Sequence, residues 1–366
     1  MNYYIIAGEA SGDLHASNLM KSLKVLDASA QFRCWGGDLM QKQGGEIVKH
    51  YRDLAFMGFT EVLMNIRTIF KNIDFCKKDI LENKPDVLIL VDYPGFNLRI
   101  AEFAKENNIK VFYYISPQIW AWKQSRVHKI KKVVDKMFVI LPFEKEFYSR
   151  FDYNVDFVGH PLLDAVNNYS KESSDLGLTF DKPIIAILPG SRKQEISTLL
   201  PLMLSMRKYY PNYQFVVAGA PSQAPEYYQT FFPDKEVKIV FGKTYQLLQK
   251  SEAALVASGT ATLETALFGV PEVVCYIAGK ISFVIAKQLI KVKYISLVNL
   301  IMDKEIVREL IQADLNEENL KSELDKLLTK ETRNKLLADY AELKTKLGGL
   351  GASERTAELM INYLKQ

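Results

Sequence analysis

Residues 86–97 read DVLILVDYPGFN, an apolar run that ends in Asp92 and is followed by a proline and a glycine. A short, fully apolar run bounded by turn-forming residues is typical of a parallel strand that is buried on both faces of its sheet. The helical pattern that begins at about Asn97 predicts a helix after this strand. The stretch therefore indicates a βαβ unit, in which ligands bind at the carboxyl ends of the strands.

The same alternation of strands and helices continues on both sides of this stretch. A polar segment, residues 160–182, separates two halves and is predicted to be a connection between domains. From Lys304 onward the pattern is helical, with a break at residues 348–351 and a last helix at 353–364. The predicted fold is α/β, with two facing, Rossmann-like, doubly wound domains and a helical C-terminal segment. Further strands are expected at residues 3–8, 32–37, 110–116, 136–141, 183–192, 214–220, 237–243, 253–260 and 271–276.

The composition is that of an ordinary globular protein. The chain has 366 residues, of which 48% are hydrophobic and 25% are charged. This length suggests two domains, and these proportions exclude disordered, collagen-like and coiled-coil chains. The 47 Lys and Arg residues against 43 Asp and Glu residues give a net charge of +4. Such a small surplus does not predict a nucleic-acid partner.

Cysteine usage and the N-terminal sequence predict a cytoplasmic protein. The three cysteines are scattered and odd in number, which indicates a reducing compartment and neither a disulfide framework nor a metal site. The N-terminal run MNYYIIAGEASGD enters a strand directly, so we expect no secretory signal. No segment is long and apolar enough to predict a transmembrane helix.

Two strand ends in the first domain carry acidic residues. The run AGEASGD, residues 7–13, places Glu9, Ser11 and Gly12 at a strand-to-helix turn, where backbone amides favour an anion. A plain tight turn explains these small residues equally well. Asp92 follows a buried strand, where burial raises the pKa of a carboxyl group and a general base is effective. The alternative is that Asp92 only caps the loop, and Asn97 is predicted to be the helix N-cap.

Residues 116–130, SPQIWAWKQSRVHKI, combine two tryptophans with several basic side chains. This mixture suits nucleic-acid stacking, an interdomain wall or a site for a phosphorylated sugar. Packing of Trp120 and Trp122 in the structure is the simpler interpretation. His128 has no cysteine or second histidine nearby, so it is not expected to bind a metal.

The second domain offers two strand ends that suit a diphosphate. In the run LPGSR, Ser191 and Arg192 lie between a strand and a helix, where amides, a hydroxyl and a guanidinium converge. In the run ASGTATLE, Ser258, Gly259 and Thr260 begin a second helix. A plain N-cap is the alternative there.

Glu264 follows Thr260 by four residues, which places it one helical turn further along the same face. At that position its carboxylate would reach ribose hydroxyls while the amides at the helix start hold phosphate. The alternative is an ordinary surface glutamate.

Several familiar motifs are absent from the sequence. There is no D-x-D, no H-E-x-x-H and no Cys/His cluster, so we expect no metal, and helix ends with Arg192 would stabilise a leaving diphosphate. The P-loop spacing and the G-x-G-x-x-G fingerprint are missing as well. Their absence disfavours a kinase, an ATPase or a dehydrogenase.

Apolar residues at helical spacing line residues 54–75 and form a stripe wider than one core contact requires. Core packing explains one face of this helix. The apolar residues outside that face predict contact with lipid, with nearby basic residues close to anionic headgroups. The residues expected at the membrane are Phe59, Leu63, Ile66, Ile69 and Phe70.

Eight motifs, taken in order, resemble those of the lipid-A-disaccharide synthases: AGEASGD, VDYPGFN, SPQIWAW, LPFEKEFY, FVGHPLLD, LPGSR, ASGTATLE and SLVNLI. The resemblance extends from about Gly8 to Leu310. It implies a GT-B fold with an acceptor and membrane-contact domain at residues 1–165 and a UDP-sugar domain at 166–347. The last helix, residues 348–366, would return to the first domain. One departure is Val298, where the family usually has proline.

The resemblance implies an inverting, metal-independent hexosyltransferase that uses no cofactor. The donor would be UDP-2,3-diacylglucosamine and the acceptor 2,3-diacylglucosamine 1-phosphate (lipid X). The products would be UDP and the β-1,6-linked lipid A disaccharide 1-phosphate. The enzyme would be a homodimer, peripheral on the cytoplasmic face of the inner membrane.

The resemblance also implies roles for the candidate residues. Asp92 matches the family's essential aspartate and would accept the proton of the acceptor 6-hydroxyl, with Glu9 beside it in the catalytic site. The donor side would include Asn299 as well as the diphosphate and ribose residues named above. Ser11 and Gly12 would belong to the acceptor side of the cleft.

Two other readings stay open from the residues alone. One is another UDP-sugar enzyme of the GT-B fold, such as a lipid-linked N-acetylglucosaminyltransferase or a UDP-sugar epimerase. The wide apolar stripe disfavours the epimerase. The other is a lipid or nucleotide carrier without catalysis, which would have no use for Asp92 opposite a phosphate site.

Overall fold

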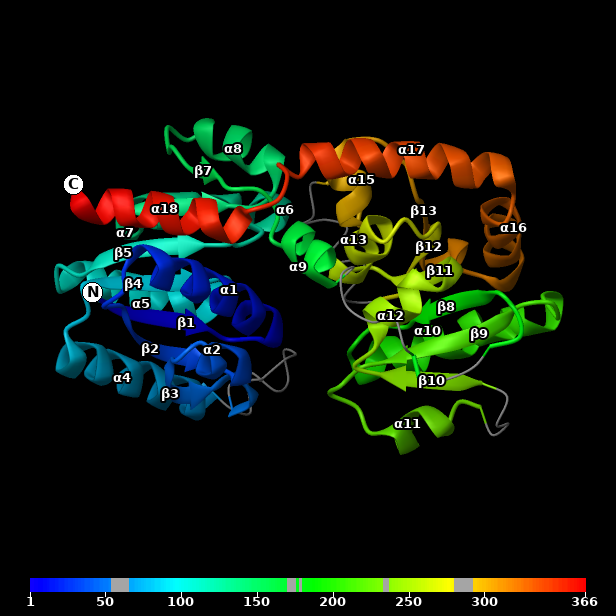
Figure 1. Ribbon diagram of the computed structural model, residues 1–366, viewed down its shortest axis with the longest axis horizontal. Coiled ribbons are helices and arrows are strands. Elements are labelled where there is room, and N and C mark those ends of the chain that lie inside the picture. The colour runs from blue at the N-terminus through cyan, green and yellow to red at the C-terminus, as the bar shows by residue number, and fades with distance from the viewer. Residues whose placement is uncertain (54–65, 170–175, 178–179, 233–236, 280–291) are drawn as a thin grey trace. The chain divides into compact units, whose positions relative to one another are not determined.

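The computed structural model describes residues 1–53, 66–169, 176–177, 180–232, 237–279 and 292–366. Contacts divide the chain into two compact units: unit 1 comprises Met1–Pro161 and Gly348–Gln366, and unit 2 comprises Leu162–Leu347. Each unit contains its own parallel sheet with helices packed on it (Figure 1). The predicted α/β class with two doubly wound sheets is confirmed.

Within the described residues, unit 1 forms a seven-stranded parallel sheet in the order β3-β2-β1-β4-β5-β6-β7. The central strands β1, β4 and β5 are buried along almost their whole length, which explains their continuous apolar sequences. The strands are Asn2–Ala7 (β1), Gln31–Gly36 (β2), Glu46–His50 (β3), Val87–Val91 (β4), Lys110–Tyr114 (β5), Lys136–Val139 (β6) and Asp156–Phe157 (β7).

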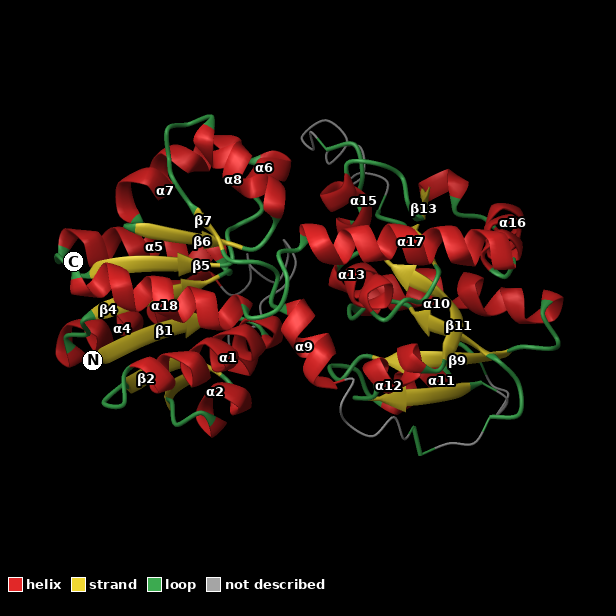
Figure 2. Cartoon of the chain, turned by 45° about the horizontal axis from the view of Figure 1, so that its top comes forward, coloured by secondary structure: helices red, strands yellow, loops and turns green. Residues whose placement is uncertain are grey.

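Two layers of helices cover this sheet. Helix α1 contacts α2 and α18, whereas α5 contacts α4 and α7, so each face of the sheet has its own layer (Figure 2). The helices of unit 1 are Ala10–Leu26 (α1), Asp38–Lys42 (α2), Ile66–Asn83 (α4), Pro94–Glu106 (α5), Ile119–Trp122 (α6), Val127–Val133 (α7), Pro142–Ser149 (α8) and Ala352–Lys365 (α18), with 3₁₀ turns at Tyr51–Asp53 (η1) and Gln124–Arg126 (η2).

In the described part of unit 2, a six-stranded parallel sheet has the order β10-β9-β8-β11-β12-β13. Its strands are Ile184–Leu188 (β8), Gln214–Gly219 (β9), Lys238–Phe241 (β10), Ser251–Ala257 (β11), Glu272–Tyr276 (β12) and Arg308–Ile311 (β13). Its helices are Leu162–Tyr169 (α9), Lys193–Ser205 (α10), Pro225–Gln229 (α11), Thr244–Gln249 (α12), Thr260–Leu267 (α13), Leu297–Met302 (α15), Glu317–Leu327 (α16) and Lys330–Lys346 (α17), with 3₁₀ turns at Met206–Tyr209 (η3) and Gln312–Asp314 (η4).

The structure corrects several predicted elements. Strand β13 pairs with β12, so the chain after Lys304 is not purely helical. Strands β3 and β7 were not predicted either. All three are edge strands with partly exposed residues, so their sequences lack the continuous apolar run of a central strand. Helix α9 lies inside the polar segment that was expected to be only a connection.

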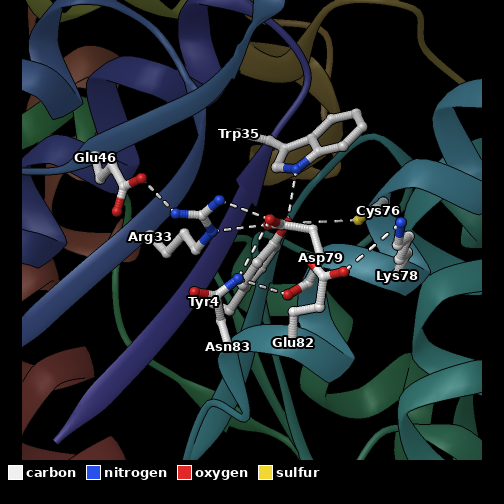
Figure 3. A network of polar contacts seen from close by, with 9 residues as sticks. All are labelled: Tyr4, Arg33, Trp35, Glu46, Cys76, Lys78, Asp79, Glu82 and Asn83. Carbon is white, nitrogen blue, oxygen red and sulfur yellow. Dashed lines mark hydrogen bonds and ion pairs between the residues drawn. The ribbon is translucent and has the colours of Figure 1, made fainter.

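A buried polar network fastens helix α4 to the sheet of unit 1 (Figure 3). Arg33 of β2 donates to both carboxylate oxygens of Asp79 in α4, with Nε–Oδ2 at 2.8 Å and Nη2–Oδ1 at 2.6 Å. The Tyr4 hydroxyl donates to Asp79 Oδ2 at 2.7 Å and accepts from Trp35 Nε1 at 2.8 Å. Burial alone would raise the pKa of Asp79, but Arg33 and Tyr4 hold it below its usual value. The network therefore fixes which face of α4 points outward.

The C-terminal helix α18 belongs to unit 1 and lies along α1 (Figure 1). Arg355 of α18 donates from Nε to the Val158 carbonyl at 3.0 Å and from Nη2 to the Gly348 carbonyl at 3.2 Å. The chain leaves unit 1 after Pro161 and returns to it at Gly348. One guanidinium therefore holds both connecting segments to unit 1.

Candidate active site

The strand order of unit 1 reverses between β1 and β4, which are neighbours in the middle of the sheet. β1 is followed by β2 on one side and β4 by β5 on the other, and ligands of such sheets bind outside the carboxyl ends at this switch point. Ala7 and Val91 are paired in register, so the loops that carry Glu9 and Asp92 leave the sheet side by side. The structure thus brings together the two carboxyl groups that were predicted to be catalytic.

The backbone around Asp92 is held in an unusual conformation. Asp92 and Tyr93 both have left-handed φ angles, 45° and 50°, which non-glycine residues rarely adopt. The Asp92 carbonyl accepts hydrogen bonds from the Tyr113 hydroxyl at 2.5 Å and from Asn97 Nδ2 at 2.6 Å. Strain that is fixed by such bonds is typical of functional sites.

Asn97 differs from its predicted role. It lies inside α5, fully buried, and its side chain donates to the Asp92 carbonyl. The helix begins earlier than expected, at Pro94, with Tyr93 as its N-cap. A proline is well suited to the first turn because its missing amide is not needed there. Asn97 therefore supports the bend at Asp92 and does not cap the helix.

Gly8 makes room for this bend. A Cβ atom on Gly8 would lie 2.4 Å from the ring of Tyr93, a distance that no real Cβ contact shows. The loop after β1 and the loop after β4 are therefore packed directly on each other. Gly8 is required by this close approach.

Glu9 affects the protonation of Asp92. Burial and, to a smaller extent, the negative charge of Glu9 together raise the pKa of Asp92 to about 6. Glu9 is the N-cap residue of α1 and is partly buried. A carboxylate with a pKa near 6 remains ionised at neutral pH and is a stronger base than an ordinary aspartate.

The remaining candidates on this edge play different roles. Ser11 is exposed in the first turn of α1, whereas Gly12 is buried and packs against Ala7. Asp13 was not predicted, yet its carboxylate accepts from the amides of Gly37 at 2.8 Å and Met40 at 3.1 Å. Asp13 therefore holds the start of α2 in place. Sequence spacing alone did not indicate this bond because its partners lie in another loop.

In unit 2 the strand order reverses between β8 and β11. Leu188 and Val256 are paired in register, so the loop with Ser191 and Arg192 lies beside the loop that begins α13. The switch point of the second sheet therefore brings together the two segments that were predicted to bind a diphosphate.

The donors at Ser191 and Arg192 already have a partner in the structure. Glu195 Oε2 accepts from both backbone amides, at 3.2 and 3.3 Å, and its Oε1 accepts from Arg192 Nη1 at 2.8 Å. Gly190 has a φ of 98° and lies against this carboxylate. Glu195 was not among the predicted site residues, although a glutamate three residues after an N-cap is the signature of a capping box. An anion at these amides would have to displace Glu195.

The start of α13 is more open. Gly259 is exposed, with a φ of 156°, and a Cβ atom added there would have no heavy atom within 4 Å. Thr260 is the first residue of the helix and is also exposed. Ser258 is held by its hydroxyl, which donates to the Ile295 carbonyl at 3.1 Å. Gly259 and Thr260 therefore present the helix N-terminus to solvent, where an anion is favoured.

Glu264 lies one turn into α13 and is partly buried. The Tyr245 hydroxyl donates to its Oε1 at 2.8 Å, and burial raises the pKa of Glu264. The Tyr245 ring packs against Phe268 with centroids 5.0 Å apart. One carboxylate oxygen is thus fixed by a rigid aromatic neighbour.

Asn299 does not present its side chain to a ligand. It is fully buried in α15, and its Oδ1 accepts from the amides of Ile306 at 2.7 Å and Val307 at 3.0 Å. Its Nδ2 donates to the Val307 carbonyl at 2.8 Å and to Glu309 at 2.9 Å. Asn299 therefore supports the turn before β13. The neighbouring Val298, where the family usually has proline, is buried in the same helix.

The predicted membrane residues are only partly described. Phe59 and Leu63 lie outside the described residues, and Ile66 begins α4. Ile69 is partly buried, and Phe70 is 49% exposed with the Arg99 guanidinium 5.4 Å from its ring centroid. Among the described residues, no helix is both long and apolar enough to cross a membrane.

The tryptophans after β5 have different environments. Trp120 is buried and packs edge-on against Phe143 with centroids 4.9 Å apart, as the packing interpretation predicts. Trp122 is 47% exposed, so packing does not explain it. Across the part of the chain that the structure describes, no group of three or more His, Cys, Asp or Glu side chains is arranged to hold a metal ion.

Solved structures with this architecture include several UDP-sugar enzymes. UDP-GlcNAc 2-epimerase from Methanocaldococcus jannaschii, in complex with UDP-GlcNAc and UDP, has a TM-score of 0.68 at 15% identity and covers 99% of this chain and 100% of its own. The calicheamicin glycosyltransferase CalG4 has a TM-score of 0.64 at 14% identity and covers 100% of this chain and 98% of its own. At these identities the likeness shows the GT-B fold.

Proteins found by sequence comparison share more identical residues with this chain than those solved structures do. Residues 3–361 match the family model described as lipid-A-disaccharide synthetase. The lipid-A-disaccharide synthase of Trichlorobacter lovleyi is 38% identical over 99% of this chain and 97% of its own length. That of Syntrophus aciditrophicus is 39% identical over the same shares of the two chains. The chain therefore belongs to the lipid-A-disaccharide synthetase family, whose members are hexosyltransferases of lipid A biosynthesis.

Proposed function

We propose that this protein transfers the sugar of UDP-2,3-diacylglucosamine to the 6-hydroxyl of 2,3-diacylglucosamine 1-phosphate. The products are UDP and the β-1,6-linked lipid A disaccharide 1-phosphate. Membership of the lipid-A-disaccharide synthetase family supports this reaction. The observation that carries the proposal within the structure is the raised pKa of Asp92 at the switch point of unit 1.

Asp92 acts as the general base in this proposal. Its carboxylate accepts the proton of the 6-hydroxyl, the hydroxyl oxygen attacks the anomeric carbon, and the bond from that carbon to the UDP oxygen breaks. Attack opposite the leaving group inverts the configuration. Glu9 keeps Asp92 basic through its negative charge. Ser11 and Gly12 belong to the same edge of the sheet and are assigned to the acceptor side.

Unit 2 supplies the donor site in this proposal. The open start of α13, at Gly259 and Thr260, holds the diphosphate, and Glu264 binds the ribose with the oxygen that Tyr245 leaves free for it. Arg192 and the Ser191 amide join the diphosphate when Glu195 releases them. Donors directed at the leaving group stabilise the charge that develops on UDP. The nucleotides bound in the related epimerase structure support a UDP site on this fold.

We also propose that helix α4 carries the membrane-binding face. Phe70 and Leu81 are exposed on α4, 49% and 46%, and the basic Lys78 is exposed on the same helix. Apolar side chains flanked by lysine suit the interface of an anionic bilayer. In this proposal the protein binds the cytoplasmic face of the inner membrane through α4. We also propose that it is a homodimer, as the resemblance to the family implies. Phe70→Glu is expected to weaken binding to anionic vesicles, with circular dichroism unchanged because Phe70 is not core.

The test of the reaction is mass spectrometry of products made by the purified protein. With both acylated sugars present, the expected product has the mass of the tetraacyl disaccharide phosphate, and it forms only with both substrates. Formation of an epimerised UDP-sugar without acceptor would contradict the proposal in favour of an epimerase. Transfer to a polyprenyl-linked acceptor alone would favour a lipid-linked N-acetylglucosaminyltransferase. Binding of UDP without any turnover would indicate a carrier.

A further inference from the structure

The loop after β5 contains side chains to which the proposed reaction assigns no role. The loop starts beside the catalytic edge of unit 1, because Val91 of β4 is paired with Tyr114 of β5. The Asp92 amide donates to the Tyr114 carbonyl at 3.2 Å. Any ligand group bound by this loop near its start is therefore close to Asp92.

The base of the loop is rigidly built. Ile115 has a left-handed φ of 65°, an unusual conformation for a β-branched residue, and its amide donates to the Phe138 carbonyl at 3.0 Å. The hydroxyls of Ser116 and Tyr148 are hydrogen-bonded at 2.7 Å in the interior. A strained but fully supported turn of this kind holds the rest of the loop in a fixed position.

The outer part of the loop exposes one aromatic ring between two cations. Trp122 is 47% exposed; Lys123 Nζ lies 4.3 Å and Arg126 Cζ 5.7 Å from its ring centroid. Among the described residues, neither cation forms an ion pair with a carboxylate, whereas Lys129 of α7 pairs with Glu102 at 2.8 Å. Two positive charges that share one ring repel each other, and an anion bound between them removes that repulsion.

Arg126 also acts on the surroundings of the catalytic base. The Tyr113 hydroxyl donates to the Asp92 carbonyl at 2.5 Å. Burial raises the pKa of Tyr113 most, and Asp92 raises it as well, whereas the positive charge of Arg126 lowers it. The charge of Arg126 therefore reaches the hydroxyl that donates to the Asp92 carbonyl.

We propose that Trp122, Lys123 and Arg126 bind the phosphate monoester of the acceptor sugar. This inference rests on the proposed function and adds the group that selects a phosphorylated acceptor. A phosphate monoester carries about −1.5 to −2 charges at pH 7 and matches two cations. Arginine contacts two phosphate oxygens at once and lysine adds a compact charge, while the tryptophan ring offers its face or edge to the sugar. With its phosphate held here, the acceptor directs its free hydroxyl toward Asp92.

The first experiment measures binding without turnover. Glucosamine 1-phosphate is titrated into the wild-type protein with tryptophan fluorescence as the signal, because Trp35 and Trp120 are buried and Trp122 is exposed. We expect a saturable change that glucosamine does not produce. The double variant K123Q/R126Q should lose it, and the control Lys129→Gln should keep it because Lys129 is paired with Glu102.

The second experiment compares 2,3-diacylglucosamine 1-phosphate with 2,3-diacylglucosamine as acceptors. In the double variant, kcat/KM for the phosphorylated acceptor should fall at least about tenfold, mainly through KM. The unphosphorylated acceptor should react at the wild-type rate, and the affinity for UDP should not change. The variant would thus lose its preference for phosphate while keeping the chemistry.

The outcomes separate this inference from the proposed function. Equal binding of glucosamine 1-phosphate to wild type and K123Q/R126Q, or an unchanged preference between the two acceptors, overturns the phosphate site. Loss of binding to vesicles that contain anionic phospholipid, with unchanged acceptor kinetics, would assign the cations to the membrane and also overturn it. If wild type transfers to neither acceptor, the proposed function fails, and the fluorescence titration alone decides on the phosphate site.

Discussion

The switch points of the two sheets share one topology and differ in chemistry. In unit 1 the edge between β1 and β4 carries two carboxyl groups, Glu9 and Asp92. In unit 2 the edge between β8 and β11 carries backbone amides, Arg192 and an exposed helix start. The first edge is suited to removing a proton and the second to holding an anion.

The residue types that adopt positive φ angles also differ between these two edges. At the switch point of unit 2 the positive φ angles belong to Gly190 and Gly259, where they cost little. At the switch point of unit 1 they belong to Asp92 and Tyr93, where each costs on the order of 1–3 kcal/mol. An anion site is built from open backbone amides, which glycine provides at little cost, whereas a catalytic carboxyl group requires a side chain at the bend, so the strain of a positive φ remains there.

Replacing Asp92 should have the largest effect. Asp92→Asn is expected to lower kcat by about 10²–10⁴-fold, the usual contribution of a general base, with UDP affinity unchanged because UDP is assigned to unit 2. The folded-state pKa of about 6 lies above the ordinary value of 3.8, so the stability of the fold falls as the pH rises from about 3.8 to about 6, and the full cost of ionised Asp92 is present above pH 6. The Asn variant should therefore melt at a higher temperature. Near-normal kcat would refute the role of Asp92.

Replacing Arg192 tests the switch point of unit 2. Arg192→Gln removes a charge-assisted contact to the diphosphate and should weaken UDP binding by about 10- to 100-fold. The side chain is 64% exposed and paired only with Glu195 among the described residues, so the melting temperature should hardly change. Isothermal titration with UDP measures the affinity. A fall in kcat at saturating donor with unchanged UDP affinity would place Arg192 elsewhere in the reaction.

Replacing Glu195 should change the affinity for UDP in the opposite direction. Glu195→Gln removes the negative charge that occupies the amides of Ser191 and Arg192, so UDP should bind several-fold more tightly. The same change weakens the capping box of α10 and should cost about 0.5–2 kcal/mol in the free energy of unfolding. Weaker UDP binding in this variant would mean that Glu195 positions Arg192 for the ligand and does not compete with it.

Glu9 should produce the smallest and most specific change. Its charge raises the pKa of Asp92, although burial contributes more. Glu9→Gln should therefore shift the acidic limb of the kcat profile to lower pH by less than the whole difference between 6 and 3.8. The wild-type rate itself should fall as the pH drops through about 6, because protonated Asp92 cannot accept a proton. An unmoved limb would show that the two carboxyl groups do not interact.

Most of the fold was predictable from local patterns. The central strands β1, β4, β8 and β11 are continuous apolar runs because both of their faces are buried. The edge strand β13 was missed because its sequence, RELI, is half exposed and mixed in character. The predicted start of α5 at Asn97 was wrong for a different reason: Pro94 begins that helix after a bend at Asp92, which hydrogen bonds from Tyr113 and Asn97 hold in place.

Local sequence patterns were sufficient to predict the class of the fold, the family and the strand ends at which chemistry is possible. Apolar patterns and motif order are properties of the linear sequence, so they are visible before the chain is folded. Which groups meet became visible with the folded chain: Glu9 lies near Asp92, Glu195 accepts from the amides of Ser191 and Arg192, and Asn299 accepts from the loop before β13. Hydrogen bonds and charge interactions act over a few ångströms in space, and sheet topology, not chain distance, sets those separations.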